Sequence, residues 1–316
     1  MNKGDLRRVN LTLSKAFTHT KIQEGLSKKS AHVPRVRPDF LEMYLTANPE
    51  GCFVAEEDGK IVAFCFSRRW GKMGWLGPLS VLPSHQNRGI GKTIVKAGIE
   101  ALKREGVRTL GLEMVASSAR NLAFYSRLGF KVVTPTVDLF ASIEIIDDTE
   151  ISSQYTLNYY HSLEKKERLS FIRSCNKLSN SLQAGLDYSK EIELVDQFKF
   201  GDACLIKKND EATAFILAHA EPYSLEERRQ FLKVNILQLA ANLPVTELFT
   251  VLVVLKHWAT QENLSGIYLR VPLSYLPAFE YLLTRGFKLL HTDLRLTLRG
   301  YDLNDSSAAV NFSKWE

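Results

Sequence analysis

The chain repeats itself at a fixed interval, and this repeat limits its architecture more than any other feature. Residues 105–115 and 262–272 both begin with glutamate and continue as an alternating apolar run. Each is followed by a helix-like stretch and by a Gly-Phe-Lys triplet, at Gly129 and at Gly286, which lie 157 residues apart. A fixed internal period of this length implies duplicated domains.

Further features support two domains joined by a polar segment. The length of 316 residues suits about two domains. Residues 51–67 and 202–220 resemble each other near the same offset, whereas residues 141–155 are acidic and polar in the middle. The sequence therefore predicts one domain over 1–145, a second over 150–302 and a loosely held tail over 303–316.

Both halves show the same order of strand and helix patterns. The Asp58-Gly59 turn between two apolar runs is a strong hairpin signal, and apolar residues over 94–102 recur at helical spacing. In the first half we expect helices within 10–47 and over 91–104 and 120–128, and strands over 52–56, 61–68, 75–82, 109–115 and 131–139. In the second half we expect helices up to about 190, near 246–262 and after 271, and strands over 203–218, near 233–241, over 266–271 and within 287–299.

Composition argues against several classes of protein. Apolar residues make up 45% of the chain and charged residues 24%, and no apolar run approaches the length of a membrane span. The basic N-terminus lacks the apolar segment of a secretory signal. The four cysteines have no metal-ligand spacing and no base beside them, which favours small buried side chains over a metal site or a nucleophile. We therefore expect a cytoplasmic, globular protein without a metal.

The net positive charge is confined to the first half. The formal net charge of +6 falls entirely within residues 1–150, and residues 151–316 sum to zero. A basic half attracts polyanions, but no basic run or aromatic-interleaved motif favours nucleic acid. A phosphate-rich cofactor fits the charge equally well, and a solvated surface is the simplest explanation.

Residues 86–91, Gln-Asn-Arg-Gly-Ile-Gly, follow a predicted strand and precede a predicted helix. Unpaired N–H groups and the helix dipole make such a helix start an anion site. Glycine at 89 and 91 removes Cβ atoms beside this site, and Arg88 or Lys92 adds positive charge. A P-loop needs glycine where Gln86 stands, and a dinucleotide site needs a third glycine and a later acid, so neither is favoured.

This strand, loop and helix resembles the acetyl-CoA motif of the GNAT superfamily, Gln/Arg-x-x-Gly-x-Gly/Ala. A second stretch, Asn121 to Phe130, resembles the family's ending Asn-x-x-Phe-Tyr-x-x-x-Gly-Phe. The resemblance implies two tandem GNAT-like α+β domains, each a mixed, mostly antiparallel sheet flanked by helices, with acetyl-CoA as the cosubstrate. It also implies that the cofactor is contacted by Leu79, Val81, Gln86, Arg88, Gly89, Ile90, Gly91, Lys92 and Asn121.

The same resemblance assigns the proton chemistry to Tyr125. In this family the equivalent tyrosine often protonates the leaving thiolate, although a helix-face aromatic that packs on the core is the alternative. Backbone dipoles near Leu79 and Val81 are expected to hold the developing oxyanion. The general base is less defined: Glu113 on the next strand is the candidate, a paired carboxylate is the alternative, and His85 lies beside the phosphate loop.

The second half departs from the motif. In the repeat frame, the positions of the loop and of the tyrosine carry Leu243, Thr246, Leu248 and Leu282. We therefore expect a degenerate GNAT-like domain that binds no CoA. The predicted activity is direct transfer of an acetyl group from acetyl-CoA to a primary amine of a small molecule or peptide. The alternative is a non-catalytic acyl-CoA-binding regulatory module. The acceptor and the oligomeric state stay open, with a homodimer as one option.

Overall fold

The protein is described by a computed structural model that covers residues 1–303 and 310–314. Its helices are α1 (Leu6–Gln23), α2 (Pro38–Ala47), α3 (Ile90–Arg104), α4 (Ala119–Arg127), α5 (Lys165–Leu182), α6 (Ser189–Gln197), α7 (Leu248–Gln261) and α8 (Leu276–Thr284). Its strands are β1 (Phe53–Glu57), β2 (Lys60–Trp70), β3 (Met73–Val81), β4 (Thr109–Val115), β5 (Phe130–Ser142), β6 (Tyr155–Tyr159), β7 (Gly201–Lys208), β8 (Glu211–His219), β9 (Phe231–Leu239), β10 (Gly266–Pro272), β11 (Lys288–Leu298) and β12 (Asn311–Ser313).

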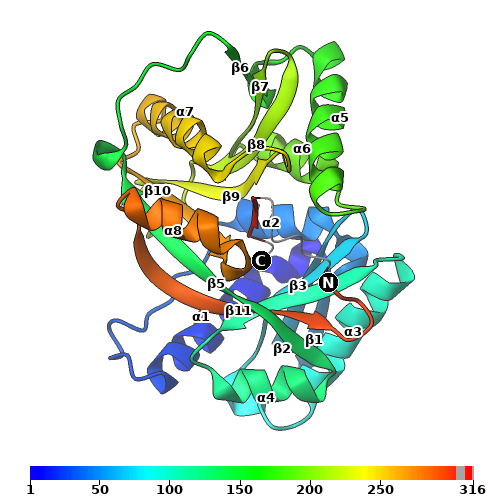
Figure 1. Ribbon diagram of the computed structural model, residues 1–316. Coiled ribbons are helices and arrows are strands. Elements are labelled where there is room, and N and C mark those ends of the chain that lie inside the picture. Colours follow the sequence, from blue (N-terminus) through cyan, green and yellow to red (C-terminus); the bar gives the residue numbers. More distant parts are fainter. Residues whose placement is uncertain (304–309, 315–316) are drawn as a thin grey trace.

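The described strands form one twisted sheet (Figure 1). Its order is β1-β2-β3-β4-β11-β5-β10-β9-β8-β7-β6, and β12 pairs with β9 beside this path. Two neighbouring pairs are parallel, β3 with β4 in the first half and β9 with β10 in the second, and the other pairs are antiparallel. This arrangement confirms the predicted mixed, mostly antiparallel α+β fold.

The long strands β5 and β11 are exchanged between the halves. β5, from the first half, lies between β11 and β10 of the second half, while β11 lies between β4 and β5. The two strands pair with each other from Phe130 opposite Leu298 to Phe140 opposite Lys288. They cross the middle of the molecule side by side in Figure 1. Each half therefore completes the sheet of the other.

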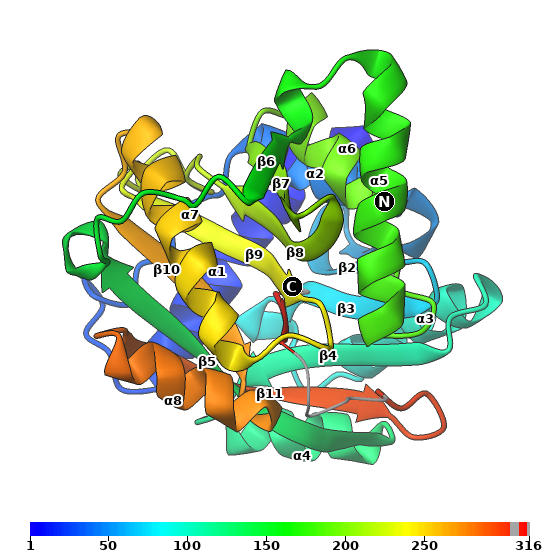
Figure 2. The same cartoon turned by 45° about the horizontal axis from the view of Figure 1, so that its top comes forward.

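Helices cover both faces of this sheet because each buries one apolar side (Figure 2). In the first half α3 and α4 pack on one face and α1 and α2 on the other. In the second half α7 and α8 share a core with β5 and β9, and α5 and α6 pack on the opposite face. Trp70 and Trp75 of the first half belong to the same core as α5 and α6. The two halves thus share buried side chains as well as strands.

The C-terminal tail is partly a buried strand. β12 pairs with β9 through Phe312 opposite Leu237, and Val310 and Phe312 are buried. The expectation of a loosely held tail is therefore wrong for residues 310–314. The sequence does not predict β12, because a strand of three residues is too short to show a periodic pattern. Residues 304–309 and 315–316 lie outside the described part of the chain.

Most predicted elements agree with the observed ones to within a few residues, but β6 was not expected, and α6 continues to Gln197 where helices were expected to end near 190. The clearest difference lies at β5, which extends to Ser142 because it crosses to pair with β10. β11 is one continuous strand where several were expected. The polar segment marked as the domain boundary contains the end of β5 and the connection to β6, and the residue limits of the two domains stay a prediction.

Candidate functional site

The predicted anion loop joins β3 to α3 and lies open at the surface. Gly89, just before the helix, adopts a left-handed backbone with φ of 82°, and no side chain caps the helix start at Ile90. Within this turn the Thr93 N–H bonds to the Gly89 carbonyl. The earlier N–H groups of such a start point outwards, where the helix dipole adds partial positive charge. Lys92, exposed in the same turn, adds a full charge.

The two glycines of the loop meet different surroundings. A Cβ at Gly89 would meet no atom within 4 Å, and the positive φ there disfavours any larger residue. A Cβ at Gly91 would lie 3.5 Å from Val81 Cγ2 and 3.6 Å from Phe124 Cζ. The open space expected at both glycines is thus found at Gly89. A Cβ at Gly91 would instead face the protein and make ordinary van der Waals contacts with β3 and α4, so packing there does not require glycine.

Polar side chains brace the loop. Gln86 donates from Nε2 to the Val81 carbonyl at 3.1 Å and accepts from Arg120 at 3.0 Å, so it connects β3 with α4. Arg88 donates two hydrogen bonds to Glu57 on β1, and this guanidinium lowers the pKa of the Glu57 carboxyl. Gln86 therefore positions the loop, whereas the positive charge of Arg88 is partly neutralised by its ion pair with Glu57.

Strand β3 separates from β4 before it reaches the loop. The two parallel strands pair as far as Leu76, and β3 then continues to Val81 paired with β2 alone. The Leu82 N–H bonds to Val62 on β2. Because backbone directions alternate along a strand, the polar groups of Leu79 and Val81 point to the side that β4 has left. We call residues 79–81 the open edge; it ends at the anion loop.

Tyr125 lies on α4 in the apolar cluster shared by α3, α4 and β4. Its ring contacts Phe124 and Phe130 edge to face, and the residue is 8% exposed. Burial raises the pKa of the Tyr125 hydroxyl well above its usual value, so the hydroxyl keeps its proton at neutral pH. Asn121 stands one turn earlier, half-buried in the first turn of α4.

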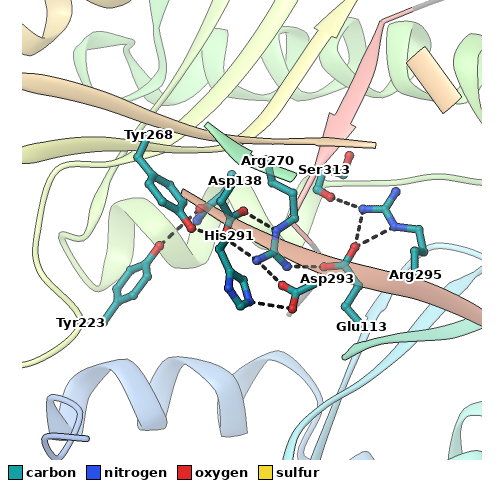
Figure 3. Close-up of polar contacts among 10 residues, drawn as sticks. Glu113, Asp138, Tyr223, Tyr268, Arg270, His291, Asp293, Arg295 and Ser313 are labelled. Atoms are coloured by element: carbon teal, nitrogen blue, oxygen red, sulfur yellow. Dashed lines mark hydrogen bonds and ion pairs between the residues drawn. The ribbon is translucent and has the colours of Figure 1, made fainter. Parts of the chain in front are cut away.

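Glu113 belongs to a buried ion-pair cluster that joins the two halves (Figure 3). Its Oε1 accepts from Arg295 Nη2 at 2.6 Å, its Oε2 accepts from Arg270, and its side chain has no exposed surface. A carboxylate held by two guanidinium groups and sealed from solvent is not placed to take a proton from an incoming amine. The geometry therefore favours the paired-carboxylate interpretation of Glu113 over the general base.

The rest of this cluster escaped the sequence analysis. Arg270 also pairs with Asp138 and with Asp293, and Asp293 contacts His291. The signal for it is the alternation of His291, Asp293 and Arg295, which places three polar side chains on one face of β11. Alternation alone does not distinguish a buried polar face from a solvated one, because the burial depends on which strands flank β11.

Among its described residues, the second half has no open helix start or free strand edge of the kind found in the first half. Leu248, in the repeat position of Gly91, is completely buried at the start of α7, and Glu247 before it bonds Tyr155 and Lys208. β9 separates from β10 after Val234, as β3 does from β4, but here β12 pairs with the freed edge. An acidic helix start and an occupied strand edge do not suit a diphosphate-bearing ligand.

A small cavity lies between the halves. It has a volume of about 20 Å³ and is lined by Trp70, Arg68, Glu191 and His219 among others. Both ring nitrogens of His219 lack a hydrogen-bond partner among the described residues. Space of this size holds little more than one water molecule. Trp70, which lines this cavity, and Trp75 are both buried in the shared core.

Other features of the described residues limit the chemistry. No helix there has both the length and the apolar character needed to cross a bilayer. Within the same residues, His, Cys, Asp and Glu side chains form no group of three or more suited to a metal ion. The cysteines are buried and unpaired, and burial raises the pKa of the Cys52 thiol to about 11, which keeps it protonated.

Comparison with known families finds similarity mainly in the first half of the chain. Residues 19–130 match the family model described as "Acetyltransferase (GNAT) family". A mycothiol acetyltransferase of Streptomyces griseus is 30% identical over 131 residues, which are 41% of this chain and 40% of that protein. The [ribosomal protein bS18]-alanine N-acetyltransferase of Escherichia coli K12 is 34% identical over 92 residues, 27% of this chain and 62% of that protein. This chain thus matches about two fifths of the Streptomyces relative.

A solved structure resembles the whole chain. A tandem GNAT protein from the clavulanic acid biosynthesis pathway superposes with a TM-score of 0.61 at 12% identity, covering 94% of this chain and 96% of that one. At this identity the likeness concerns the fold. The superposition confirms the predicted fold, two GNAT-like units in tandem in one chain.

Proposed function

Because residues 19–130 of this chain belong to the GNAT acetyltransferase family, we propose that the protein transfers an acetyl group from acetyl-CoA to a primary amine. One observation carries the proposal: the open edge of β3 leads directly into the uncapped start of α3. An acyl-CoA is an amide-containing arm that ends in a diphosphate. The strand edge suits the arm and the helix start suits the diphosphate, in the same order.

Different residues of the first half bind the diphosphate and the amide-containing arm of acetyl-CoA. Backbone N–H groups at Ile90 and Gly91 bind the diphosphate, with Lys92 adding charge. Leu79 and Val81 offer N–H and carbonyl groups to the amides of the arm, as a neighbouring strand would. These contacts come from the main chain, so they depend on backbone conformation more than on side-chain identity.

The remaining positions support this backbone site. Gly89 keeps the approach to the diphosphate clear, and Gln86 holds the loop against β3. Asn121 lies beside the arm, and Arg88 contributes charge from the rim while it remains paired with Glu57. Glu57 partly neutralises the charge of Arg88. We therefore expect Arg88 to contribute less than Lys92 to the affinity for acetyl-CoA.

The chemistry needs little from the chain, since acetyl-CoA supplies an acetyl group already activated as a thioester. Tyr125 holds a proton for the leaving sulfur. A backbone N–H of the open edge stabilises the carbonyl oxygen as negative charge develops on it. The acceptor is a primary amine of a small molecule or peptide, and the reaction runs in the cytoplasm, where the four cysteines stay reduced.

Release of CoA in the presence of amines tests the proposal. The purified chain is mixed with acetyl-CoA and a thiol reagent and screened against polyamines, amino acids, aminoglycosides and peptides with N-terminal alanine. Faster release with one class of amine supports the transferase. Tight acetyl-CoA binding without release for any amine supports a regulatory binding module instead, and absence of binding rejects both.

A matched pair of glycine variants locates the binding site. Gly89→Val and Gly300→Val impose the same strain, because both glycines have φ of 82° and open space around the missing Cβ. Gly89→Val is expected to weaken acetyl-CoA binding by at least about tenfold, or about 1.4 kcal/mol, in isothermal titration calorimetry. Gly300→Val is expected to bind normally; equal losses in both would mean that strain alone is responsible.

A further inference from the structure

A histidine-aspartate pair lies on the exchanged strand β11 (Figure 3). His291 Nε2 is 2.9 Å from Asp293 Oδ1, and Arg270 Nη2 is 2.7 Å from Asp293 Oδ2. The Asp293 side chain is 6% exposed and the His291 side chain 46%. The carboxylate is thus anchored from behind by an arginine, while the imidazole reaches the surface.

The pair lies on the face of the sheet that α3 does not cover. Leu294 and Leu296 of β11 point into the cluster beneath α3. Side chains alternate along a strand, so His291, Asp293 and Arg295 point to the other face, where Arg295 meets Glu113 of β4. On that face α1 and α2 pack against β2, whereas the His291 side chain on β11 stays 46% exposed, so a dissolved acceptor can reach the imidazole.

The register places the pair beside β4, the strand that lies between β11 and the open edge of β3. Asp293 lies directly opposite Val115 on β4, and the Ala116 N–H bonds to the Thr292 carbonyl. Neighbouring strands are about 4.8 Å apart. Tyr125, in contrast, belongs to the cluster beneath α3. The proton donor and the His291 pair therefore approach the same pair of strands from opposite faces.

We propose that His291 is the general base of the acetyl transfer, oriented by Asp293; the inference rests on the proposed function. His291 takes a proton from the attacking amine, directly or through one water, as the new N–C bond forms. The C–S bond of the thioester breaks, its electron pair stays on sulfur, and Tyr125 gives the sulfur a proton. The products are the acetamide and CoA, with the proton from the amine on His291 and a phenolate at Tyr125 that solvent reprotonates.

The hydrogen bond sets the tautomer that this role needs. A buried carboxylate that Arg270 already holds accepts hydrogen bonds, so the proton of neutral His291 sits on Nε2 and the lone pair on Nδ1. Asp293, Asp138 and Arg270 are the charged groups that face the ring. Asp293 contributes most and raises the pKa of His291 above its ordinary value of 6.5, which brings the base closer to neutral pH.

Other candidates are less well placed. Glu113 is sealed between two arginines, and His85 sits 2.9 Å from Glu57 beside the phosphate loop. His161 forms a similar pair with Asp202, but it lies beside β7, near the far end of the sheet from β4. His161 therefore serves as a control with the same chemistry in the wrong place.

The test compares His291→Gln with His161→Gln at two nucleophiles. The side chains of His291 and His161 are 46% and 63% exposed, so both variants should fold. With an alkylamine acceptor, His291→Gln is expected to lower kcat/KM by about 100-fold and to remove the rise of activity with pH above 6.5. With hydroxylamine, which is already unprotonated at neutral pH, the loss should be much smaller. His161→Gln should match the wild type in both assays.

The outcomes separate this inference from the proposed function. If the wild type transfers acetyl groups but His291→Gln keeps its rate and pH profile, His291 is not the base and the transferase stands. An equal loss with both nucleophiles and an unchanged pH profile indicates a structural role and also overturns the inference. A wild type that releases no CoA with either nucleophile overturns both proposals.

Discussion

Arg295 and Glu113 face each other across β11 and β4, with the guanidinium Nε and Nη2 at 2.7 and 2.6 Å from one carboxylate oxygen. One residue comes from each half of the duplicated chain, and both side chains are essentially unexposed. Arg295 also donates to the Ser313 carbonyl at 2.6 Å, so the same guanidinium connects the exchanged strand, the first half and the C-terminal strand.

Removal of the Glu113 charge is expected to destabilise the whole fold. Glu113→Gln leaves Arg270 and Arg295 facing a neutral amide in a buried site, and breaking a buried pair in this way costs about 3–5 kcal/mol. Chemical denaturation should show this loss, and the exposed Glu100→Gln should show none. If Glu113→Gln unfolds normally but turns over much more slowly, Glu113 acts as a base after all.

Replacement of Tyr125 by Phe should separate turnover from binding. Loss of the hydroxyl removes the proton for the leaving sulfur, so we expect kcat to fall by about 100-fold. The ring contacts with Phe124 and Phe130 remain, so acetyl-CoA affinity should stay near normal. Steady-state kinetics and calorimetry measure the two effects. Parallel losses of kcat and affinity would instead assign Tyr125 to packing, and Tyr160→Phe, in another core, is the control.

His219 should make the fold sensitive to mild acid. Burial lowers the pKa of His219 to about 3, so the folded state stays neutral while the unfolded chain binds a proton below about pH 6.5. Stability is therefore full above that pH and falls as the pH drops towards 3. The expected loss is about 2 kcal/mol between pH 7 and about pH 5.

A variant at this position isolates the effect. His219→Leu cannot bind the proton in either state, so its free energy of unfolding should change less over the same range. Urea denaturation at several pH values measures the difference between the two slopes. Identical slopes would show that other groups cause the acid sensitivity.

The C-terminal strand should contribute to global stability. Phe312 is 2% exposed and packs in the core of the second half, so Phe312→Ala should cost about 3–5 kcal/mol. Thermal unfolding of the full chain measures the change. An unaltered melting temperature would mean that β12 is only loosely docked on β9.

Local signals in the sequence were enough for most elements. Thr109–Val115 was predicted with the observed limits, because its alternation is bounded by breaks on both sides. The Asp58-Gly59 turn gave the first hairpin, and the segment from Gln86 to Gly91 gave the start of α3. In each case the information lies within a few residues of the element that it specifies.

Relationships between distant strands were not predictable in this way. The patterns of β5 and β11 are the same whichever neighbours they have, so the exchange leaves no local trace. In the sequence alone, Glu113 cannot be distinguished from any other carboxylate on a strand. Its partners Arg270 and Arg295 come from the second half and lie beside it only in the folded chain. The His291 pair was missed for the same reason, since its orientation depends on Arg270 from another strand.

The strand exchange also explains why a half without a phosphate cradle persists. Two separate copies of one ancestral half would make the same exchange between chains, as a swapped dimer. Fusion into one polypeptide turns that association into an intramolecular step with a high effective concentration. Deletion of the second half would remove β11 from beside β4 and leave β4 an unprotected, aggregation-prone edge, so the first half needs these strands even though the described part of the second half has no phosphate cradle.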